Sequence, residues 1–422
     1  MKNTVLLALF LSFLAFPAHA EQPAVAASSP PPAVSLGGVN DSVAPVGPLA
    51  PITAPPPLAD TMASEVPPLD LAARQAILID TATGTVLYAK NADEPMPTSS
   101  LSKMMTLYLT FEALKDGKLH LNDMLTVSKN AWSQQGSRTF LNIGQKVSVE
   151  DLIRGVIVQS GNDAAVTLAE GQASGSEAAF VDLMNATAKE LGMTRTHFVN
   201  ATGLPDLHHY STARDLATLA LHLIRDFPQY YHYFSEETFA FNGIKQGNRN
   251  PLLYRNIGVD GLKTGHTDVG GYGLCASEVR NGRRLLALLN GMASMQARAD
   301  VGAQLLDYGF QEFGLYPIAK KGDVMAQAKV WLGTHKDVKL VAAQDAEIDL
   351  PRAARSELKA VVGFTQPIAA PIKKGQQIGV LTISAPHMTD EVVPLVAASD
   401  VPRVGFFTRM WDKLGALLGG SS

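Results

Sequence analysis

The chain has 422 residues and carries 35 lysines and arginines against 39 aspartates and glutamates, a formal net charge of −4. No basic run interrupts this balance, so nucleic acid is not expected as a partner. The single cysteine, Cys275, cannot close an internal disulfide, and its apolar surroundings indicate a small core residue rather than a nucleophile. No Cys-x-x-Cys pair is present to hold a metal, and we expect neither a metal nor a cofactor.

The first twenty residues have the pattern of a secretory signal peptide. Lys2 supplies the positive start, residues 5–16 an apolar core, and Ala18-His19-Ala20 a small-residue cleavage site. The apolar run is too short for an ordinary membrane-spanning helix. We therefore expect cleavage before Glu21 and an exported mature protein.

Residues 21–69 are rich in proline, alanine and serine, which predicts a disordered spacer. The triplets Pro30-Pro31-Pro32 and Pro55-Pro56-Pro57 favour an extended polyproline conformation, and the composition is too poor in large apolar side chains to bury a core. A binding segment for a partner is the alternative interpretation, since a proline-rich tract has only a compositional signal.

Two predicted strands, residues 76–80 and 85–90, precede an apolar helix predicted over residues 101–114. At its start stand Ser100 and Lys103, which are three positions apart and so lie on one helical face. Burial of Lys103 would lower the pKa of its amine, and a neutral amine beside a hydroxyl is a nucleophile with its base. A capped helix whose lysine reaches solvent is the competing interpretation of this short motif.

A second polar segment interrupts two apolar helices. Ser148 and Asp151 open a helix predicted over residues 149–158, the break Ser160-Gly161-Asn162 follows, and a small-residue helix continues over residues 163–173. In the functional interpretation, Ser160 relays a proton and Asn162 hydrogen-bonds a substrate amide. In the structural interpretation, the break is an ordinary turn between helices.

A third polar segment, Lys263-Thr264-Gly265, lies on a predicted strand or at its end. Lys263 and Thr264 offer a cation and a hydroxyl to a carboxylate, and Gly265 leaves room for a ligand backbone to approach. An exposed lysine on an edge strand is the alternative. Two further helices are predicted over residues 177–191 and 213–225. Two strands are predicted over residues 272–279 and 285–290, and a turn at Asn281-Gly282 joins them.

The three motifs occur in the order Ser100-x-x-Lys103, Ser160-x-Asn162 and Lys263-Thr264-Gly265, each on the type of element expected of it. A single match carries little weight, but three in order behind a signal peptide are specific. The chain resembles the serine acyl-transferases that include penicillin-binding proteins and serine β-lactamases.

Longer segments carry a closer resemblance, to the low-molecular-mass D-alanyl-D-alanine carboxypeptidases. These segments are Ser99 to Thr106, Ser160 to Ala164, Gln246 to Tyr254 and Val259 to Thr267. Gly161 stands in the middle of the second motif, where many β-lactamases carry aspartate. The resemblance covers about residues 70–418.

The resemblance implies a mixed α/β catalytic domain of the β-lactamase and penicillin-binding-protein type over residues 70–315. It has a helical part and a five-stranded antiparallel sheet flanked by helices, with the site between them. Over residues 316–398, short alternating apolar runs broken by glycine, proline and charges predict a small all-β domain, similar to the family's second domain. The sequence leaves open whether that domain is a spacer or a docking site.

The same resemblance implies the chemistry. Ser100 attacks the carbonyl between the two terminal D-alanines of a peptidoglycan stem peptide, and Lys103 takes its proton. Ser160 and Lys263 help to pass a proton to the departing D-alanine. The acyl-enzyme replaces one hard step by two easier ones, and β-lactam antibiotics acylate the same serine.

Further site residues follow from the resemblance. The backbone N–H groups of Ser100 and His266 form the oxyanion hole, and Lys263, Thr264 and Arg298 hold the terminal carboxylate. Arg298 is assigned by its alignment position alone, and a solvated arginine at a helix start is the alternative. His266 acts either through its backbone, which we favour, or through an imidazole that tunes activity near neutral pH.

The final segment, residues 399–422, contains an amphipathic helix predicted over residues 404–418. Its apolar side chains fall on one helical face and its positive charges flank them, but it is too short to span a bilayer. We interpret it as a helix lying in the membrane interface, with Trp411 at headgroup level. A helix docked on the protein itself or on a partner is the alternative. Together with the signal peptide, it predicts a bacterial protein on the periplasmic face of the inner membrane.

The sequence is compatible with three functions. The favoured one is a membrane-attached serine D,D-carboxypeptidase that trims stem peptides in cell-wall synthesis, with an endopeptidase action on cross-links left open. The second is a serine β-lactamase, but the glutamate motif that activates water in one class of these enzymes is not found after Asn162. The third is a non-catalytic wall-binding or scaffold protein, against which the intact catalytic residue types argue.

Overall fold

The computed structural model describes residues 58–405 of the chain. The predicted signal peptide, most of the predicted spacer and, beyond residue 405, the predicted amphipathic helix lie outside the described residues. Between residues 58 and 405, no helix is long and apolar enough to cross a membrane.

A five-stranded antiparallel sheet organises the region before residue 313, as predicted. The strand order is β2-β1-β9-β8-β7, so the first strand of the chain lies beside the last one of this region. Within the described residues, β7 pairs only with β8, which leaves its other edge open. The strands are β1 (Gln75–Asp80), β2 (Val86–Lys90), β7 (Val259–Thr267), β8 (Gly271–Arg280) and β9 (Arg283–Met292).

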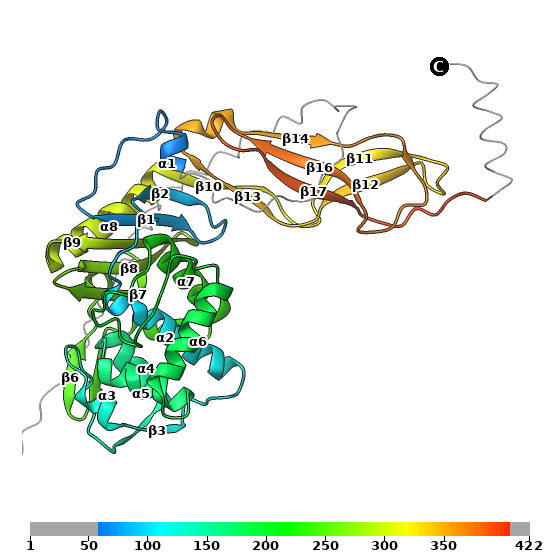
Figure 1. Ribbon diagram of the computed structural model, residues 1–422. Helices are drawn as coiled ribbons and strands as arrows, with labels where there is room; N and C mark the ends of the chain where they lie inside the picture. Colours follow the sequence, from blue (N-terminus) through cyan, green and yellow to red (C-terminus); the bar gives the residue numbers. More distant parts are fainter. Residues whose placement is uncertain (1–57, 406–422) are drawn as a thin grey trace, which may run out of the picture. The chain divides into compact units, whose positions relative to one another are not determined.

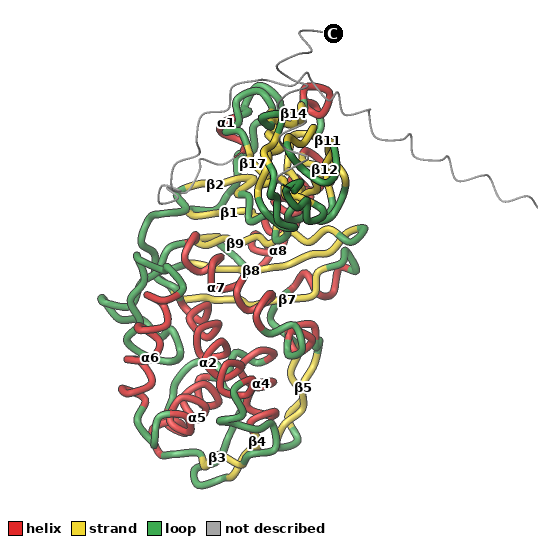
Figure 2. The backbone as a smooth tube through the Cα atoms, turned by 90° about the vertical axis from the view of Figure 1, so that its right-hand side faces the viewer, coloured by secondary structure: helices red, strands yellow, loops and turns green. Residues whose placement is uncertain are grey.

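Helices cover both faces of this sheet (Figures 1 and 2). Because side chains of a strand alternate between faces, Ile77 and Ile79 join the apolar cluster of α2, α4, α5 and α7, whereas Ala76 and Leu78 join the cluster of α8. The helices are α2 (Lys103–Lys115), α3 (Lys129–Ser133), α4 (Val149–Val158), α5 (Asn162–Gln172), α6 (Glu177–Glu190), α7 (Ala213–Asp226) and α8 (Met295–Glu312).

Local signals explain the helices that the sequence predicted. The Ser148 side chain accepts a hydrogen bond from the Asp151 N–H at the start of α4, and Thr212 caps α7 in the same way. Helix α2 begins two residues later than expected, because a 3₁₀ turn, Ser99–Ser102, precedes it. Two small antiparallel strand pairs were not predicted: β3 (Met124–Thr126) with β4 (Lys146–Ser148), and β5 (Thr238–Phe241) with β6 (Ile244–Gly247).

The end of the predicted spacer is ordered, so the expectation of disorder is wrong for residues 58–69. Helix α1 (Leu58–Thr61) leads into Met62, which is 0% exposed, and Val66 is buried as well. Both belong to the apolar cluster that contains Leu78. Two apolar side chains suffice here because a finished sheet already offers them a surface to pack on.

The region after α8 consists mainly of strands, which confirms the predicted all-β part. A short pair, β10 with β13, accompanies a sheet of order β14-β16-β17-β12-β11-β15, in which only β15 runs parallel to its neighbour. The domain boundaries at residues 315 and 398 stay predictions. The strands are β10 (Phe313–Ala319), β11 (Val324–Trp331), β12 (Asp337–Ala342), β13 (Ala346–Pro351), β14 (Lys359–Gly363), β15 (Ile368–Ala369), β16 (Gln377–Ser384) and β17 (Glu391–Ala397).

Two glycines bring α8 close to the sheet. A Cβ placed on Gly302 would lie 2.6 Å from Leu274 of β8, and one on Gly309 would lie 2.6 Å from Leu78 of β1. Glycine weakens a helix, which is one reason why the sequence did not predict α8. The close approach also fixes Arg298, one helical turn before Gly302.

We expect Gly302→Ala to lower the free energy of unfolding by about 1–3 kcal/mol, because the added methyl group must displace Leu274. The gain in helix propensity, about 1 kcal/mol, offsets only part of this loss. Urea denaturation would measure the change. The matched control is Gln304→Ala, at an exposed position of the same helix. An equal or smaller loss in the glycine variant would contradict the close-packing argument.

Candidate active site

The first predicted pair meets as expected. Ser100 lies in the 3₁₀ turn before α2, and a hydrogen bond of 2.8 Å joins its Oγ to the Nζ of Lys103. Lys103 Nζ also donates to the carbonyl oxygen of Thr202 at 2.6 Å. Because Lys103 is 0% exposed, the alternative of a lysine that reaches solvent is wrong.

Burial prepares the Lys103 amine to act as a base. Desolvation lowers its pKa from 10.5 to about 7, and the positive charge of Arg249 acts in the same direction. The buried carboxylate of Asp163 opposes this shift. At neutral pH a large fraction of the amine is therefore unprotonated and able to accept the proton of the Ser100 hydroxyl.

The second and third motifs meet each other. Lys263 Nζ donates to Ser160 Oγ at 2.9 Å and to the carbonyl oxygen of Thr264 at 3.0 Å. Lys263 is buried, so the alternative of an exposed edge-strand lysine is wrong, and burial together with the charge of Lys103 lowers its pKa. Ser160 has a φ of 55°, a left-handed conformation that is rare outside glycine and often found at functional sites.

Asn162 has one free amide atom at the site. Its Nδ2 donates to the carbonyl oxygen of Gln135 at 2.5 Å, and its backbone N–H donates to that of Ser137 at 2.7 Å. Its Oδ1 is buried and has no partner. Since Asn162 lines the pocket, this oxygen is the acceptor of the amide that the protein leaves unused, and the predicted hydrogen bond to a substrate amide stays a prediction.

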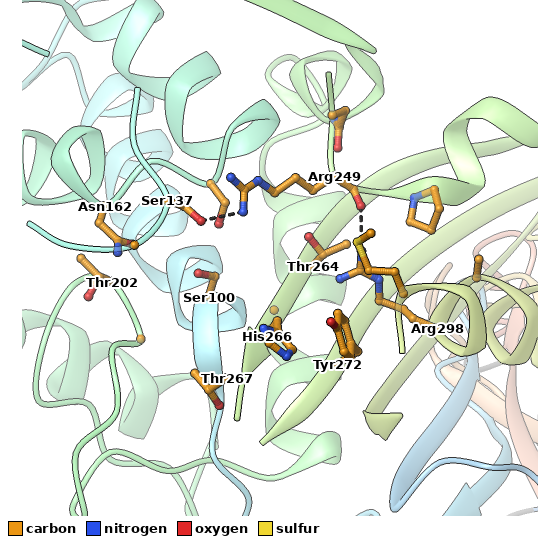
Figure 3. A pocket seen from close by; sticks show the side chains of 18 of the residues that line it. Ser100, Ser137, Asn162, Thr202, Arg249, Thr264, His266, Thr267, Tyr272 and Arg298 are labelled. Carbon is orange, nitrogen blue, oxygen red and sulfur yellow. Dashed lines mark hydrogen bonds between the residues drawn. The ribbon is translucent and has the colours of Figure 1, made fainter. Parts of the chain in front are cut away.

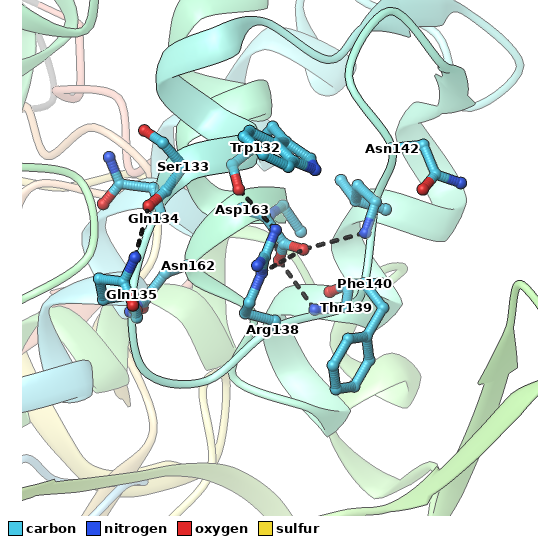
Figure 4. Close-up of polar contacts among 12 residues, drawn as sticks. Trp132, Ser133, Gln134, Gln135, Arg138, Thr139, Phe140, Asn142, Asn162 and Asp163 are labelled. Carbon is cyan, nitrogen blue, oxygen red and sulfur yellow. Dashed lines mark hydrogen bonds and ion pairs between the residues drawn. The ribbon is translucent and has the colours of Figure 1, made fainter.

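The neighbouring Asp163 holds the loop that forms this wall (Figure 4). Its buried carboxylate accepts hydrogen bonds from the N–H groups of Thr139 at 2.8 Å and Leu141 at 3.1 Å. These residues flank Phe140, whose φ is 62°. Asp163 directly follows the second motif, but its role in holding this loop was not predicted from the sequence.

Arg298 lies in the site rather than in solvent. It is 5% exposed, its guanidinium lies 5.6 Å from the ring centre of Tyr272, and it donates to the carbonyl oxygen of Arg249 at 3.1 Å. The alternative of a solvated arginine is therefore wrong. Burial lowers its pKa to about 10, which still leaves the group charged at neutral pH. Thr264 lines the same part of the pocket.

Arg249 is a site residue that the sequence analysis missed. Its guanidinium donates to Ser137 Oγ at 2.6 Å across the pocket, as Figure 3 shows. Its charge also lowers the pKa values of Lys103 and Lys263. The resemblance included the segment around Arg249, but nothing in the local sequence distinguishes this arginine from a surface one.

Gly265 and His266 occupy the end of β7. A Cβ on Gly265 would lie 3.0 Å from the Cβ of Ser99. The glycine therefore lets the strand approach the nucleophile turn. It also lines the pocket, and our expectation that it makes room for a ligand backbone stays a prediction. The imidazole of His266 is exposed and packs against Tyr272 in a tilted arrangement, with ring centres 3.9 Å apart.

The pocket has a volume of about 920 Å³, and its lining includes Ser100, Ser160, Asn162, Thr264 and Arg298. It combines a nucleophile, a neutral amine, a serine–lysine relay and cations that attract an anion. Such a set suits acyl transfer from a peptide that ends in a carboxylate. In the described part of the chain, no group of three His, Cys, Asp or Glu side chains is placed to hold a metal ion.

Comparisons with known proteins agree with this chemistry. A family model described as D-alanyl-D-alanine carboxypeptidase matches residues 60–293, and one described as the penicillin-binding protein 5 C-terminal domain matches residues 313–403. The chain is 40% identical to D-alanyl-D-alanine carboxypeptidase DacC of Escherichia coli (strain K12) over 367 residues, which cover 85% of this chain and 91% of the relative.

Solved structures give the same result. Penicillin-binding protein 5 from Haemophilus influenzae is 38% identical with a TM-score of 0.73, over 80% of this chain and 100% of that one. Penicillin-binding protein D2 from Listeria monocytogenes, in a cefotaxime-bound form, is 33% identical with a TM-score of 0.53, over 58% of this chain and 99% of that one. The predicted resemblance and fold class are confirmed, and the favoured function is supported over the β-lactamase and scaffold alternatives.

We expect the acylation of Ser100 by a fluorescent penicillin to accelerate as the pH rises through about 7, the pKa of Lys103. The sign follows from the role of the amine, because only the unprotonated form accepts the serine proton. Rates measured between pH 5.5 and 9 would test this. Lys103→Ala should abolish labelling, whereas Lys115→Ala, at an exposed position of the same helix, should not. A rate that is flat or falls with pH would contradict the assignment.

Proposed function

This chain belongs to the D-alanyl-D-alanine carboxypeptidase family, and from that premise we propose that it removes the terminal D-alanine of peptidoglycan stem peptides. The observation that carries the proposal is the hydrogen bond between the buried Lys103 amine and Ser100 Oγ. Through this bond the Lys103 amine, with its lowered pKa, is in position to accept the proton of the Ser100 hydroxyl, which is the nucleophile of the motif. The proposed enzyme is a serine-type carboxypeptidase.

Binding orients the peptide. Its terminal carboxylate lies against Thr264 and Arg298, with Arg249 adding positive charge to the same pocket. The scissile carbonyl lies at the backbone N–H groups of Ser100 and His266, which form the oxyanion hole. Each such donor contributes roughly 2.7–4 kcal/mol to stabilisation of the transition state.

Acylation then transfers one proton and breaks one bond. Lys103 accepts the Ser100 proton as Oγ attacks the carbonyl carbon. Collapse of the tetrahedral intermediate breaks the peptide bond. Lys103 gives up the serine proton, which passes through Ser160 and Lys263 to the leaving amine; Ser160 Oγ and Lys263 Nζ are 2.9 Å apart. D-Alanine departs and the shortened peptide remains as an ester on Ser100.

Hydrolysis of the ester completes the cycle. Lys103, again neutral, accepts a proton from a water molecule that attacks the ester carbonyl. The shortened peptide leaves, and Ser100 regains its proton. A β-lactam enters the same first step and forms an ester that this second step removes slowly, which accounts for penicillin binding.

The test is release of free D-alanine from a peptide that ends in D-Ala-D-Ala. We expect turnover by the chain from residue 58 to residue 405 and a loss of at least about 1000-fold in Ser100→Ala, as for other enzymes that lose their nucleophile. Normal release in Ser100→Ala would overturn the mechanism. Turnover of benzylpenicillin at several per second without D-alanine release would favour a β-lactamase instead.

We also infer that the enzyme acts on the periplasmic face of the inner membrane. The signal-peptide pattern of residues 1–20 supports export, and the amphipathic pattern of residues 404–418 supports attachment to the membrane interface. Both patterns support a location where stem peptides occur. A role in cell-wall biogenesis and cell shape follows from this location.

Deletion of residues 404–422 should release an active enzyme from the membrane fraction, because it removes the predicted amphipathic segment. Fractionation of cells that produce either form would measure this, with D-alanine release confirming that both are folded. As a control, deletion of residues 21–57 should leave membrane association intact. Persistence of the C-terminally truncated enzyme on the membrane would refute the anchor.

A further inference from the structure

One end of the six-stranded sheet presents a tryptophan to solvent that the mechanism does not use. Trp331 is the last residue of β11 and is 53% exposed. Of the Phe, Tyr and Trp residues between positions 313 and 405, it is the only exposed one. Ala369, its neighbour in β15, is exposed as well. A large aromatic side chain that stands in water gains free energy when a partner covers it.

Hydrogen bonds hold this end of the sheet in one shape. The Ala370 N–H donates to the carbonyl oxygen of Trp331 at 2.9 Å, and Arg403 Nε donates to that of Ala370 at 2.8 Å. The Val404 N–H donates to the carbonyl oxygen of Leu332 at 3.0 Å. A partner therefore meets a surface that is already formed, and little free energy is spent on ordering it.

Three segments that are far apart in the sequence meet at this end. Strands β17, β12 and β11 are neighbours in the sheet (Figure 1), and the turn from β11 to β12 covers residues 332–336. Beside this turn, Gly333 forms a β-bridge with Arg403, and Ile372 forms one with Val401. The side chains of these segments therefore act together on a partner.

The same end is positively charged. We call it the basic end and define it as residues 329–337, 367–374 and 400–405. These segments contain five lysines and arginines against two aspartates, whereas the whole chain has a net charge of −4. Lys329 pairs with Asp337 at 3.4 Å, and in the described part of the chain the other four cations form no ion pair. All four are exposed: Lys336, Lys373, Lys374 and Arg403.

The chain leaves the described structure at the basic end. Val404, whose N–H is bonded to Leu332, is also the first residue of the amphipathic helix that the sequence predicts over residues 404–418. The membrane attachment proposed above for that segment therefore brings a bilayer surface to the basic end.

Charge favours a lipid surface over two other partners. The terminal residues 406–422 carry two cations, Arg409 and Lys413, against one carboxylate, Asp412, and a positive surface repels a positive segment. Two copies of the chain that met through this end would place like charges opposite each other. Anionic headgroups have the complementary charge, and tryptophan is enriched at the interface between headgroups and acyl chains.

We propose that the basic end is a second membrane contact, in addition to residues 404–418. The ring of Trp331 enters the headgroup region of an anionic bilayer, and Lys336 and Arg403 lie against lipid phosphates. By itself the contact is weak, in line with the release expected above when residues 404–422 are deleted. It strengthens the attachment of the terminal segment, because both bind the same bilayer. The proposal rests on the membrane attachment proposed above and not on the carboxypeptidase reaction.

The fluorescence of single tryptophans tests the contact. The mature chain, residues 21–422, has three tryptophans, so Trp132→Phe with Trp411→Phe leaves Trp331 as the reporter. With vesicles of phosphatidylglycerol and phosphatidylethanolamine, we expect its emission to shift to shorter wavelengths and brominated phospholipids to quench it. Vesicles of phosphatidylcholine, which have no net charge, should give weaker effects.

A second tryptophan provides the matched control. Trp331→Phe with Trp411→Phe leaves Trp132, which is 42% exposed in α3, and its emission should not change with either kind of vesicle.

Substitutions assign the affinity for anionic vesicles to the basic end. Trp331→Ala should lower the affinity of the mature chain about tenfold, because the exposed half of the side chain is no longer covered. Lys336→Glu should lower it at least about fivefold, and by less in about 0.5 M salt, which screens the attraction. Val324→Ala and Lys321→Glu, at exposed positions at the other end of β11, are the matched controls and should leave it unchanged. Unchanged D-alanine release from a soluble peptide would show that all four variants are folded.

The alternatives give different results. Binding of the mature chain to anionic vesicles with no change in Trp331 emission overturns the second contact and leaves the terminal anchor. Emission that is already shifted without lipid, and that deletion of residues 406–422 reverses, assigns the ring to the terminal segment and overturns the proposal. A shift without lipid that grows with protein concentration overturns it in favour of a second copy. Binding to no vesicle overturns both the anchor and the second contact, and D-alanine release is measured independently of all these outcomes.

Discussion

The chemistry of this protein depends on keeping amines buried next to like charges. Lys103 and Lys263 are both removed from solvent, and Arg249 and Arg298 line the pocket beside them. Water would favour the protonated amines, so the fold must exclude it and hold the lysines through neutral partners: a serine hydroxyl and a backbone carbonyl for each. An acidic partner in direct contact would restore the charge and remove the base.

Elements with local signals were predictable from the sequence. Helix α4 was predicted with both of its ends correct, because the Ser148 cap, the apolar period and the polar break are all local. The Ser100–Lys103 pair was predictable for the same reason, since three positions along a helix bring two side chains together. The edge position of β7 was not, because strand order depends on pairing between segments far apart in the chain.

The site residues that the sequence did not reveal share one property: their roles depend on contacts with segments far away in the chain. Arg249 acts on lysines of two other elements, and Tyr272 supports Arg298 from a neighbouring strand. Gly265 is another position at which a long-range contact could not be predicted from the sequence. Its residue type marked a close approach, but the sequence could not show that Ser99, 166 positions earlier in the chain, is one of the groups that come close.

The position of the lone cysteine, Cys275, affects how the protein would resist oxidation in an oxidising compartment. Cys275 lies in β8 opposite Lys263, is fully buried, and has a pKa that burial raises further. Peroxides and disulfides react with the thiolate form of cysteine. Burial disfavours the thiolate and therefore slows both reactions. In the exported setting proposed above, the chain therefore keeps a small thiol in its core without forming mixed disulfides or covalent dimers. An unpaired thiol on an exposed loop would lack this protection.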